Sequence, residues 1–153
     1  MLDWALLPFK RYFDFQGRSR RMEYWSFALL IFVIYIVLVG IMMAGGMSLA
    51  ALSGDPAAAA AMEMGPLFYV GAGLLALFAL AIIIPSIAVV VRRLHDRDMS
   101  GWWYLGFIVA SMIPFVGFIA SIALLVLMFL PGTVGPNRFG PDPKDPGSTE
   151  VFA

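Results

Sequence analysis

Three stretches of the sequence carry no charged side chain and are apolar over a length that can cross a membrane. They are Tyr24–Ala44, Met64–Val91 and Trp102–Leu130. A transmembrane helix needs about 20 apolar residues, because it rises about 1.5 Å per residue across roughly 30 Å of hydrocarbon. Helices buried in a soluble bundle would need polar faces, which these stretches lack. The sequence therefore predicts an all-α fold, a multi-pass transmembrane helical bundle.

The composition supports a membrane environment and excludes several kinds of site. Only 13% of the 153 residues are charged, about half the share found in a soluble domain, which is too few to cover a water-soluble fold of this size. The formal net charge is zero, so we expect no nucleic-acid partner, which would need a basic face. The chain has no cysteine and one histidine. These counts exclude disulfides, thiolate sites and all-histidine metal sites within one chain, and we expect no cofactor.

The distribution of lysine and arginine predicts the orientation of two full spans, over about 23–44 and 66–91. Basic residues gather before the first span and after the second, whereas the loop between them holds only Asp55 and Glu63 as charged residues. Because basic residues favour the cytoplasmic side, we expect the N-terminus to be cytoplasmic. The expected organisation is one membrane domain, 1–153, with a cytoplasmic amphipathic segment (1–22), an outer loop (45–65), a cytoplasmic loop (92–101) and a polar tail (131–153), which we also expect to be cytoplasmic.

The third apolar stretch, 102–130, is too long for one upright helix. Its 29 residues would extend roughly 43 Å as a single helix. Pro114 and Gly117 interrupt it, so it is either one long kinked span or a helical hairpin broken at these two residues. Each arm of a hairpin would be too short to cross the bilayer, and we expect its turn to be hidden against the other helices. We favour the hairpin, which would return the tail to the cytoplasmic side.

The segment before the first span combines basic and aromatic residues. Arg18, Arg20 and Arg21 follow a run rich in aromatic side chains, a pattern typical of a segment at the level of the lipid headgroups. Either it is a positively charged anchor, or these arginines bind anionic headgroups or pair with acidic residues elsewhere. The 23 residues before the first apolar stretch would be an unusually long and aromatic n-region for a signal peptide. We therefore expect that the first span is not cleaved off as a signal peptide, although Ser48–Ala51 resembles a signal-peptidase site.

A compact group of charged residues, "RRLHDRDMSGWW", lies between the second and third apolar stretches. In a structural interpretation, Arg92 and Arg93 close a helix whose C-terminal dipole favours cations, and Trp102 and Trp103 anchor the next helix at the interface. In an enzymatic interpretation, the neighbouring His95 and Asp96 act as acid and base. No nucleophile motif, phosphate-binding loop or second metal ligand accompanies the pair, so we favour the structural interpretation and expect no enzyme.

Three segments together resemble the bacterial inner-membrane family known as domain of unknown function 805 (DUF805). They are "FDFQGRSRRMEYWSF" (Phe13–Phe27), "RRLHDRDMSGWW" (Arg92–Trp103) and "PGTVGPNRFGPDP" (Pro131–Pro143). The resemblance covers roughly Met1–Lys144 and implies a small multi-pass inner-membrane protein without an established enzymatic activity. The alanine-rich outer loop looks longer than this family needs.

If the three segments form one surface, they lie on the same side of the membrane. We then expect Asp142 to pair with Arg92, Arg93 or Arg20, and Asn137 to donate a hydrogen bond to a loop carbonyl. The expected interaction cluster is Arg18, Arg20, Arg21, Glu23, Arg92, Arg93, His95, Asp96, Trp102, Trp103, Asn137, Arg138 and Asp142.

The function expected from these features is non-enzymatic binding at a basic and aromatic cytoplasmic face. The expected partners are anionic lipid headgroups, a second membrane protein or another copy of the chain. A small oligomeric transporter or channel is the alternative, but the three apolar stretches carry no ionisable residue of the kind that lines an ion pathway. A membrane-interface enzyme that uses His95 and Asp96 is the second alternative.

Overall fold

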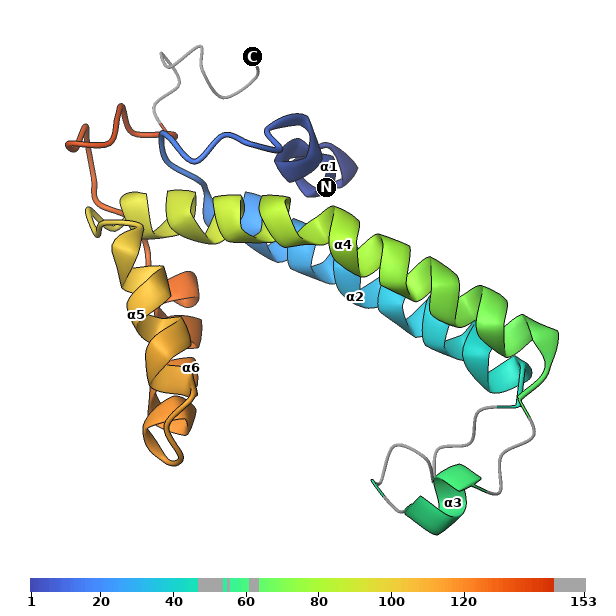
Figure 1. The fold of residues 1–153 in the computed structure, drawn as a ribbon. Coiled ribbons are helices and arrows are strands. Elements are labelled where there is room, and N and C mark those ends of the chain that lie inside the picture. Colours follow the sequence, from blue (N-terminus) through green and yellow to red (C-terminus); the bar gives the residue numbers. More distant parts are fainter. Residues whose placement is uncertain (47–53, 55, 61–63, 145–153) are drawn as a thin grey trace. The chain divides into compact units, whose positions relative to one another are not determined.

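The computed structural model describes residues 1–46, 54, 56–60 and 64–144, and the elements named over these residues are all helices. The predicted Ser48–Ala51 cleavage-like site lies outside the described residues. The all-α prediction is confirmed. In chain order the helices are α1 (Leu2–Lys10), α2 (Arg21–Ala44), α3 (Pro56–Ala60), α4 (Pro66–His95), α5 (Trp102–Ser111) and α6 (Val116–Phe129) (Figure 1).

Helices α2 and α4 are the two full spans that the sequence predicts. They have 24 and 30 residues and are long and apolar enough to cross a membrane, with lengths of about 36 and 45 Å. Helix α4 continues past the expected end at Val91 as far as His95. The last turn contains Arg92, Arg93 and His95, and basic side chains near a helix C-terminus interact favourably with the carbonyls exposed there.

The chain forms two compact units, and α2 and α4 each contribute to both. The span unit comprises Leu29–Ile83, and the cap unit comprises Met1–Ala28 together with the chain from Ile84 onward. Within the span unit α2 packs on α4, with the rings of Tyr35 and Phe78 in edge contact at 5.6 Å between centroids.

The third apolar stretch is a helical hairpin, as favoured above, and not the alternative of one long kinked span. Helices α5 and α6 lie side by side in the cap unit and are joined by a turn at 112–115 (Figure 1). Gly117 allows the close approach, because a Cβ atom there would lie 2.6 Å from the carbonyl oxygen of Ser111. The turn at 112–115 therefore begins about two residues before the break that Pro114 and Gly117 predict.

Within the cap unit the turn of the hairpin is exposed and does not pack against other helices, contrary to expectation. Met112 is 80% exposed and Phe115 89% exposed. The physical reason is that most N–H groups of the turn find carbonyls within the hairpin. The N–H groups of Met112, Ile113 and Gly117 donate to carbonyls of the hairpin at 3.1, 3.1 and 2.8 Å, and Pro114 has no N–H to satisfy.

We expect Gly45→Ala to destabilise the packing of α2 on α4. Gly45 is buried at the end of α2, and a Cβ atom there would lie 2.1 Å from the backbone nitrogen of Phe68. Overpacking of this kind costs about 1–3 kcal/mol. Gly40→Ala is the matched control, because nothing lies within 4 Å of its Cβ position. SDS titration of the purified variants in mixed micelles measures the difference, and an equal effect of both substitutions would contradict the packing of these two helices.

Candidate functional site

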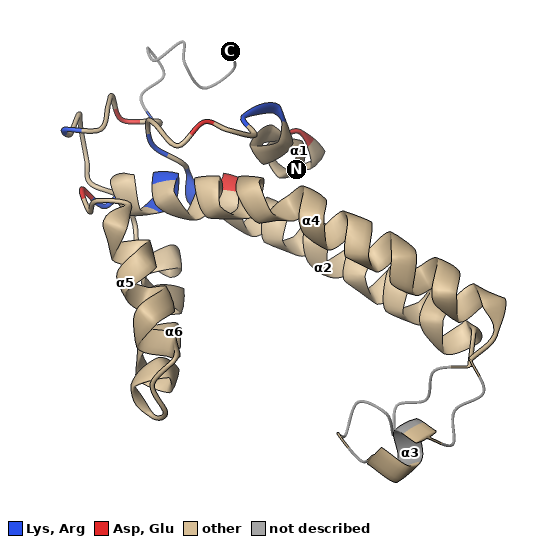
Figure 2. Cartoon of the chain, in the orientation of Figure 1, with Lys and Arg blue, Asp and Glu red and all other residues tan. Residues whose placement is uncertain are grey.

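A cluster of buried charged side chains joins three segments that are distant in the sequence. The segments are the connection from α1 to α2, the C-terminal end of α4 with its following loop, and the tail after α6. Charged residues of the described chain gather around these segments, whereas the bodies of the helices carry almost none (Figure 2). We call the buried cluster the clasp; its residues are Arg18, Glu23, Arg92, Arg93 and Asp96.

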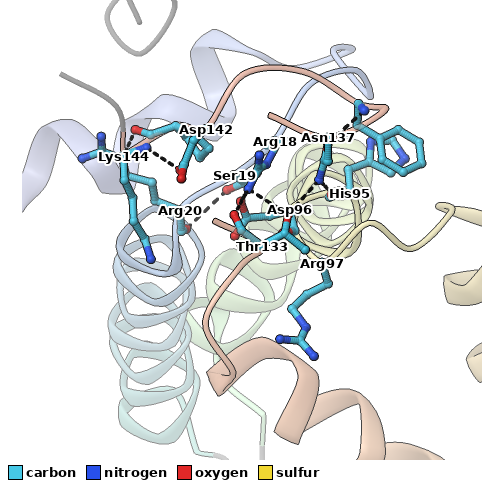
Figure 3. A network of polar contacts seen from close by, with 12 residues as sticks. Arg18, Ser19, Arg20, His95, Asp96, Arg97, Thr133, Asn137, Asp142 and Lys144 are labelled. Atoms are coloured by element: carbon cyan, nitrogen blue, oxygen red, sulfur yellow. Dashed lines mark hydrogen bonds and ion pairs between the residues drawn. The ribbon is translucent and has the colours of Figure 1, made fainter. Parts of the chain in front are cut away.

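Asp96 is the centre of the clasp, because two buried arginines share its carboxylate. Figure 3 shows one of them, Arg18, beside Asp96. Arg18 donates from Nε to Oδ1 at 3.0 Å, and Arg93 forms an ion pair with Oδ2. The three side chains are at most 3% exposed. Removing Asp96 would leave two buried arginines without their counter-charge, so both depend on this carboxylate.

A second buried ion pair ties α4 to the start of α2. Arg92 donates from Nη2 to Oε1 of Glu23 at 2.7 Å, and Ser19 donates its hydroxyl to the other carboxylate oxygen of Glu23 at 2.7 Å. The backbone N–H of Ser19 donates to the carbonyl of Arg92 at 3.1 Å. Arg92 also donates to the carbonyl of Asp14. The connection before α2 is therefore held against the last turn of α4 through side chains and backbone.

The tail is held against the same loop by hydrogen bonds to backbone groups. Arg18 donates to the carbonyls of Thr133 and Gly135, both at 2.6 Å. Thr133 in turn donates its N–H to the carbonyl of Asp96 at 2.8 Å. Gly132 makes this approach possible, because a Cβ atom there would lie 2.0 Å from Oδ2 of Asp96. The three sequence segments therefore meet in one place.

His95 is oriented by its neighbours in the clasp region and is 9% exposed. Its Nδ1 lies 3.2 Å from the carbonyl oxygen of Gly17, and its ring stacks on Phe139 with centroids 3.9 Å apart. Asn137 donates its side-chain amide to the carbonyl of His95 at 2.9 Å, which is a loop carbonyl bond of the kind expected from the sequence. Because a carbonyl only accepts, Nδ1 carries a proton, and Nε2 is an acceptor in the neutral ring.

The other basic residues of the predicted cluster lie around the clasp. Arg20 donates to the carbonyl of Pro143 and lies 5.5 Å from the ring centroid of Trp4. Arg21 is exposed and donates to the carbonyl of Phe129 at 3.2 Å. Arg138 is also exposed; its Nε lies 3.2 Å from Oδ1 of Asp98. Arg21 and Arg138 are therefore the exposed arginines of the predicted cluster, whereas Arg20 is partly buried.

Asp142, Trp102 and Trp103 are placed outside the clasp. Asp142 accepts hydrogen bonds from the N–H groups of Lys144 and Gly135, both at 3.0 Å. The bond from Lys144 lowers the pKa of Asp142 most. Burial opposes it, but the bond from Gly135 and the positive field of Arg18 keep the pKa below its usual value. Arg92 and Arg93, which we expected as its partners, pair with Glu23 and Asp96. Trp102 and Trp103 are exposed at the start of α5.

Asp14 supports the connection before α2 from outside the predicted cluster. Burial raises its pKa, but two hydrogen bonds from Arg11, at 2.6 and 2.8 Å, and one from the N–H of Gln16 outweigh that effect, so that the pKa is lowered overall. The carboxylate is therefore charged at neutral pH. Sequence reasoning missed Asp14, Gly132 and Thr133; the three-residue spacing of Arg11 and Asp14 was the available signal for Asp14.

An open apolar groove of about 600 Å³ lies beside the clasp in the cap unit. One wall is α4 and the other is α5, and His95 and Ser100 are at its polar end. Sequence reasoning missed this groove, because the apolar residues that line it have the same spacing as residues that face lipid. The groove is lined by Phe15, Ile87, Val91, His95, Ser100, Gly101, Trp102, Tyr104, Leu105 and Ile108.

The described residues offer no group of three or more histidine, cysteine, aspartate or glutamate side chains that could hold a metal ion. His95 and Asp96 are neighbours in the sequence, but their side chains have different partners. Both carboxylate oxygens of Asp96 are engaged by arginines, whereas His95 faces the carbonyl of Gly17. The arrangement can therefore hold chain segments together and can orient His95 beside the groove.

We expect Asp96→Asn to unfold the clasp at a cost of about 3–5 kcal/mol, because it leaves two buried arginines without their shared counter-charge. Asp98→Asn is the matched control. Asp98 pairs with Arg138, but their side chains are 48% and 60% exposed, so the loss is at most about 1 kcal/mol. The φ of 58° at Asp98 suits asparagine as well as aspartate. Abundance in the membrane and thermal stability in detergent measure both; equal stability of the two variants would contradict a clasp that depends on Asp96.

Comparison with known proteins places these features in a family. The model of the family described as "Protein of unknown function (DUF805)" matches residues 12–141, a range that contains all residues of the clasp. Inner membrane protein YhaH of Escherichia coli (strain K12) is 37% identical over 144 residues, which cover 94% of this chain and 98% of YhaH. Inner membrane protein YhaI of the same strain is 36% identical over 143 residues, 94% and 97% of the two chains. The uncharacterized protein YiiR of that strain is 27% identical over 151 residues, and no solved structure matches. The resemblance inferred from the three charged segments is thereby confirmed: the chain belongs to the DUF805 family.

Proposed function

We propose that this chain is a non-enzymatic protein of the bacterial inner membrane that binds a phospholipid in the groove between α4 and α5. The acyl chain lies along the apolar walls, and the headgroup lies at the polar end beside His95. The observation that carries the proposal is the groove itself: it is large, open and apolar, and it ends at the boundary between apolar helices and a polar cap. A diacyl lipid has the same division between apolar and polar parts.

The walls of the groove fit an acyl chain. Ile87 and Val91 lie one turn apart on α4, and Leu105 and Ile108 lie one turn apart on α5. The portion of α4 from Ile87 to His95 extends about 12 Å, enough for the upper part of an acyl chain. Burying apolar surface contributes about 25 cal/mol per Å², but neighbouring lipids offer the same contacts, so the shape of the groove and its polar end provide the selectivity.

The polar end of the groove offers groups for a phospholipid headgroup. Ser100 and Gly101 lead into the first turn of α5, where the positive end of the helix dipole favours a phosphate. His95 adds its Nε2 atom, because Nδ1 is engaged by Gly17. In the neutral ring Nε2 accepts a hydrogen bond from a headgroup hydroxyl or ammonium, and in the charged ring it donates one to phosphate.

The arginines of the clasp do not bind the headgroup in this proposal, although the sequence made headgroup binding one possible role of Arg18. Arg18, Arg92 and Arg93 are buried, and they bind carboxylates and carbonyls of the chain itself. Exposed cations such as Arg21 and Arg138 provide the attraction to anionic lipids instead, by about 1 kcal/mol each near the membrane surface.

The proposed orientation places the clasp on the cytoplasmic side. The connection before α2, the loop after α4 and the tail carry most of the lysine and arginine, which favours the cytoplasmic side. Contacts among these three segments support a common side for all of them. The groove then opens toward the cytoplasmic leaflet.

Neither alternative function gains support from a specific observation. The apolar parts of α2, α4, α5 and α6 contain no ionisable residue except tyrosine, which does not favour an ion pathway. The acid–base pair of an enzyme would need His95 and Asp96 to face a common substrate, but Asp96 binds Arg18 and Arg93. A homo-oligomer remains compatible with lipid binding.

Photo-crosslinking tests this proposal. The full chain in vesicles that contain phosphatidylglycerol with a diazirine on one acyl chain should crosslink preferentially at the groove residues Ile87 and Val91. Ile108→Trp should reduce these crosslinks several-fold, because the larger side chain fills the groove. Val109→Trp is the matched control, since Val109 is the adjacent exposed residue of α5 and does not line the groove.

Peptide mapping by mass spectrometry locates the crosslinks in each variant. Uniform crosslinking along all apolar helices, with no difference between the two tryptophan variants, would show that the lipid is only part of the general annulus. The same vesicles loaded with an ion-sensitive dye also test the transport alternative, because flux that depends on the protein would favour a channel.

A further inference from the structure

The hairpin of α5 and α6 has both of its ends on the side of the clasp. At the end of α6, Arg93 donates to the carbonyls of Met128 and Leu130, and Arg21 donates to that of Phe129. At the start of α5, the Cβ position of the N-cap Gly101 lies 3.5 Å from Nε2 of His95 at the end of α4. Entry and exit of the hairpin are therefore fixed at the same level, whichever side of the membrane the clasp occupies.

The arms of the hairpin are too short to cross a bilayer. Helix α5 has 10 residues and α6 has 14, which correspond to about 15 and 21 Å. The hydrocarbon core is about 30 Å thick, so one leaflet contributes about 15 Å. An arm that starts at the interface therefore ends near the middle of the bilayer.

The outer surface of the hairpin requires hydrocarbon around it. Helix α5 buries none of its residues, and α6 buries only Gly117, Ala120 and Met128. Soluble monomers rarely expose so many neighbouring large apolar side chains. The large apolar side chains exposed on the two arms are Trp102, Trp103, Leu105, Ile108, Val109, Val116, Phe118, Ile119, Ile122, Leu125, Val126 and Phe129.

Several polar groups of the hairpin form hydrogen bonds within the hairpin, which favours its burial in lipid. Ser111 donates its hydroxyl to the carbonyl of Ile108 at 2.6 Å, and Ser121 donates to that of Gly117 at 2.8 Å. Hydrogen bonds within the hairpin also use the N–H groups of the turn, as described above. Each unpaired backbone N–H or C=O group costs several kcal/mol in hydrocarbon, so pairing within the hairpin lowers the cost of placing its turn in lipid.

The tip of the hairpin is a strained turn that carries an exposed phenyl ring. Phe115 has φ 63° and ψ −46°, and the N–H of Val116 donates to the carbonyl of Pro114 at 2.7 Å. These values define a γ-turn of the rare, strained type. Glycine would adopt this conformation with less strain, and a phenyl ring 89% exposed would be unfavourable in water. A bulky apolar residue at this position suits a tip surrounded by acyl chain ends.

We propose that the α5–α6 hairpin is a re-entrant wedge that occupies one leaflet only, with Phe115 at the bilayer midplane. Its partner is the hydrocarbon of the leaflet on the clasp side. The chain then crosses the membrane twice, through α2 and α4, and adds the cross-section of two further helices to a single leaflet. This inference rests on the helix lengths, on the fixed ends of the hairpin and on the hydrogen bonds within its turn. It does not depend on lipid binding in the groove.

Depth measurements on single-cysteine variants test the wedge, and the absence of native cysteine makes them direct. Spin labels on Phe115→Cys, Trp103→Cys and Met64→Cys report the tip, the start of the hairpin and the region before α4. In liposomes, power saturation with oxygen and with a water-soluble nickel chelate gives the depth of each label. All three positions are exposed in the chain, so the labels should not disturb its packing.

The wedge predicts a label at residue 115 about 10–15 Å below the interface, with high access to oxygen and little to nickel. Labels at 103 and 64 should lie at the interface or in water. Nickel access at residue 115 equal to that at residue 64 would overturn the proposal, since the tip would then lie in water on one side or the other. Should Phe115→Cys fail to accumulate, Met112→Cys measures the same depth from the other side of the turn, since Met112 is 80% exposed.

Discussion

The organisation of the cap unit depends on the cost of burying the carboxylate of Asp96. A buried carboxylate without partners is unfavourable by several kcal/mol, and two arginines from different segments provide the compensation. Arg18 brings the connection before α2, and Arg93 brings the end of α4. Because Arg18 also donates to carbonyls of Thr133 and Gly135, the tail is held by the same group. One buried charge therefore determines which parts of a mostly apolar chain lie together.

The spans and the hairpin could be predicted from the sequence, because both follow from local properties. The length of an apolar stretch sets whether a helix can cross the bilayer, and this identified α2 and α4. Pro114 and Gly117 predicted the break between α5 and α6 for reasons of backbone geometry. The exposure of the turn was not predictable in the same way. Whether a turn needs neighbouring helices depends on whether its own N–H groups find carbonyls, and hydropathy does not report this.

The candidate site was only partly predictable, because the partners of a charged residue are decided by the fold. The sequence marked Arg18, Glu23, Arg92, Arg93 and Asp96 as notable, but it left open whether the arginines before the first span bind lipid headgroups or pair with acidic residues elsewhere. The burial of Arg18 favours pairing, since a guanidinium bound to a carboxylate inside the chain does not reach a headgroup. Gly132 and Thr133 contribute through backbone groups or through the lack of a side chain, and residue type alone gives no sign of such roles. The groove was missed because its apolar walls resemble any surface that faces lipid.

The arginines of the clasp also limit how deep the hairpin can begin. The last carbonyls of a helix have no partner within the helix and need donors from elsewhere, and at the end of α6 Arg93 and Arg21 supply them. A guanidinium is costly inside the hydrocarbon core, so the end of α6 stays near the interface with these side chains. Beyond that end nothing charged restrains either arm as far as the turn. In the proposed wedge, the depth of the tip is then set by the number of residues in the arms. Two features therefore determine how far the hairpin enters the leaflet: where the polar network of the clasp ends, and how long the two short helices are.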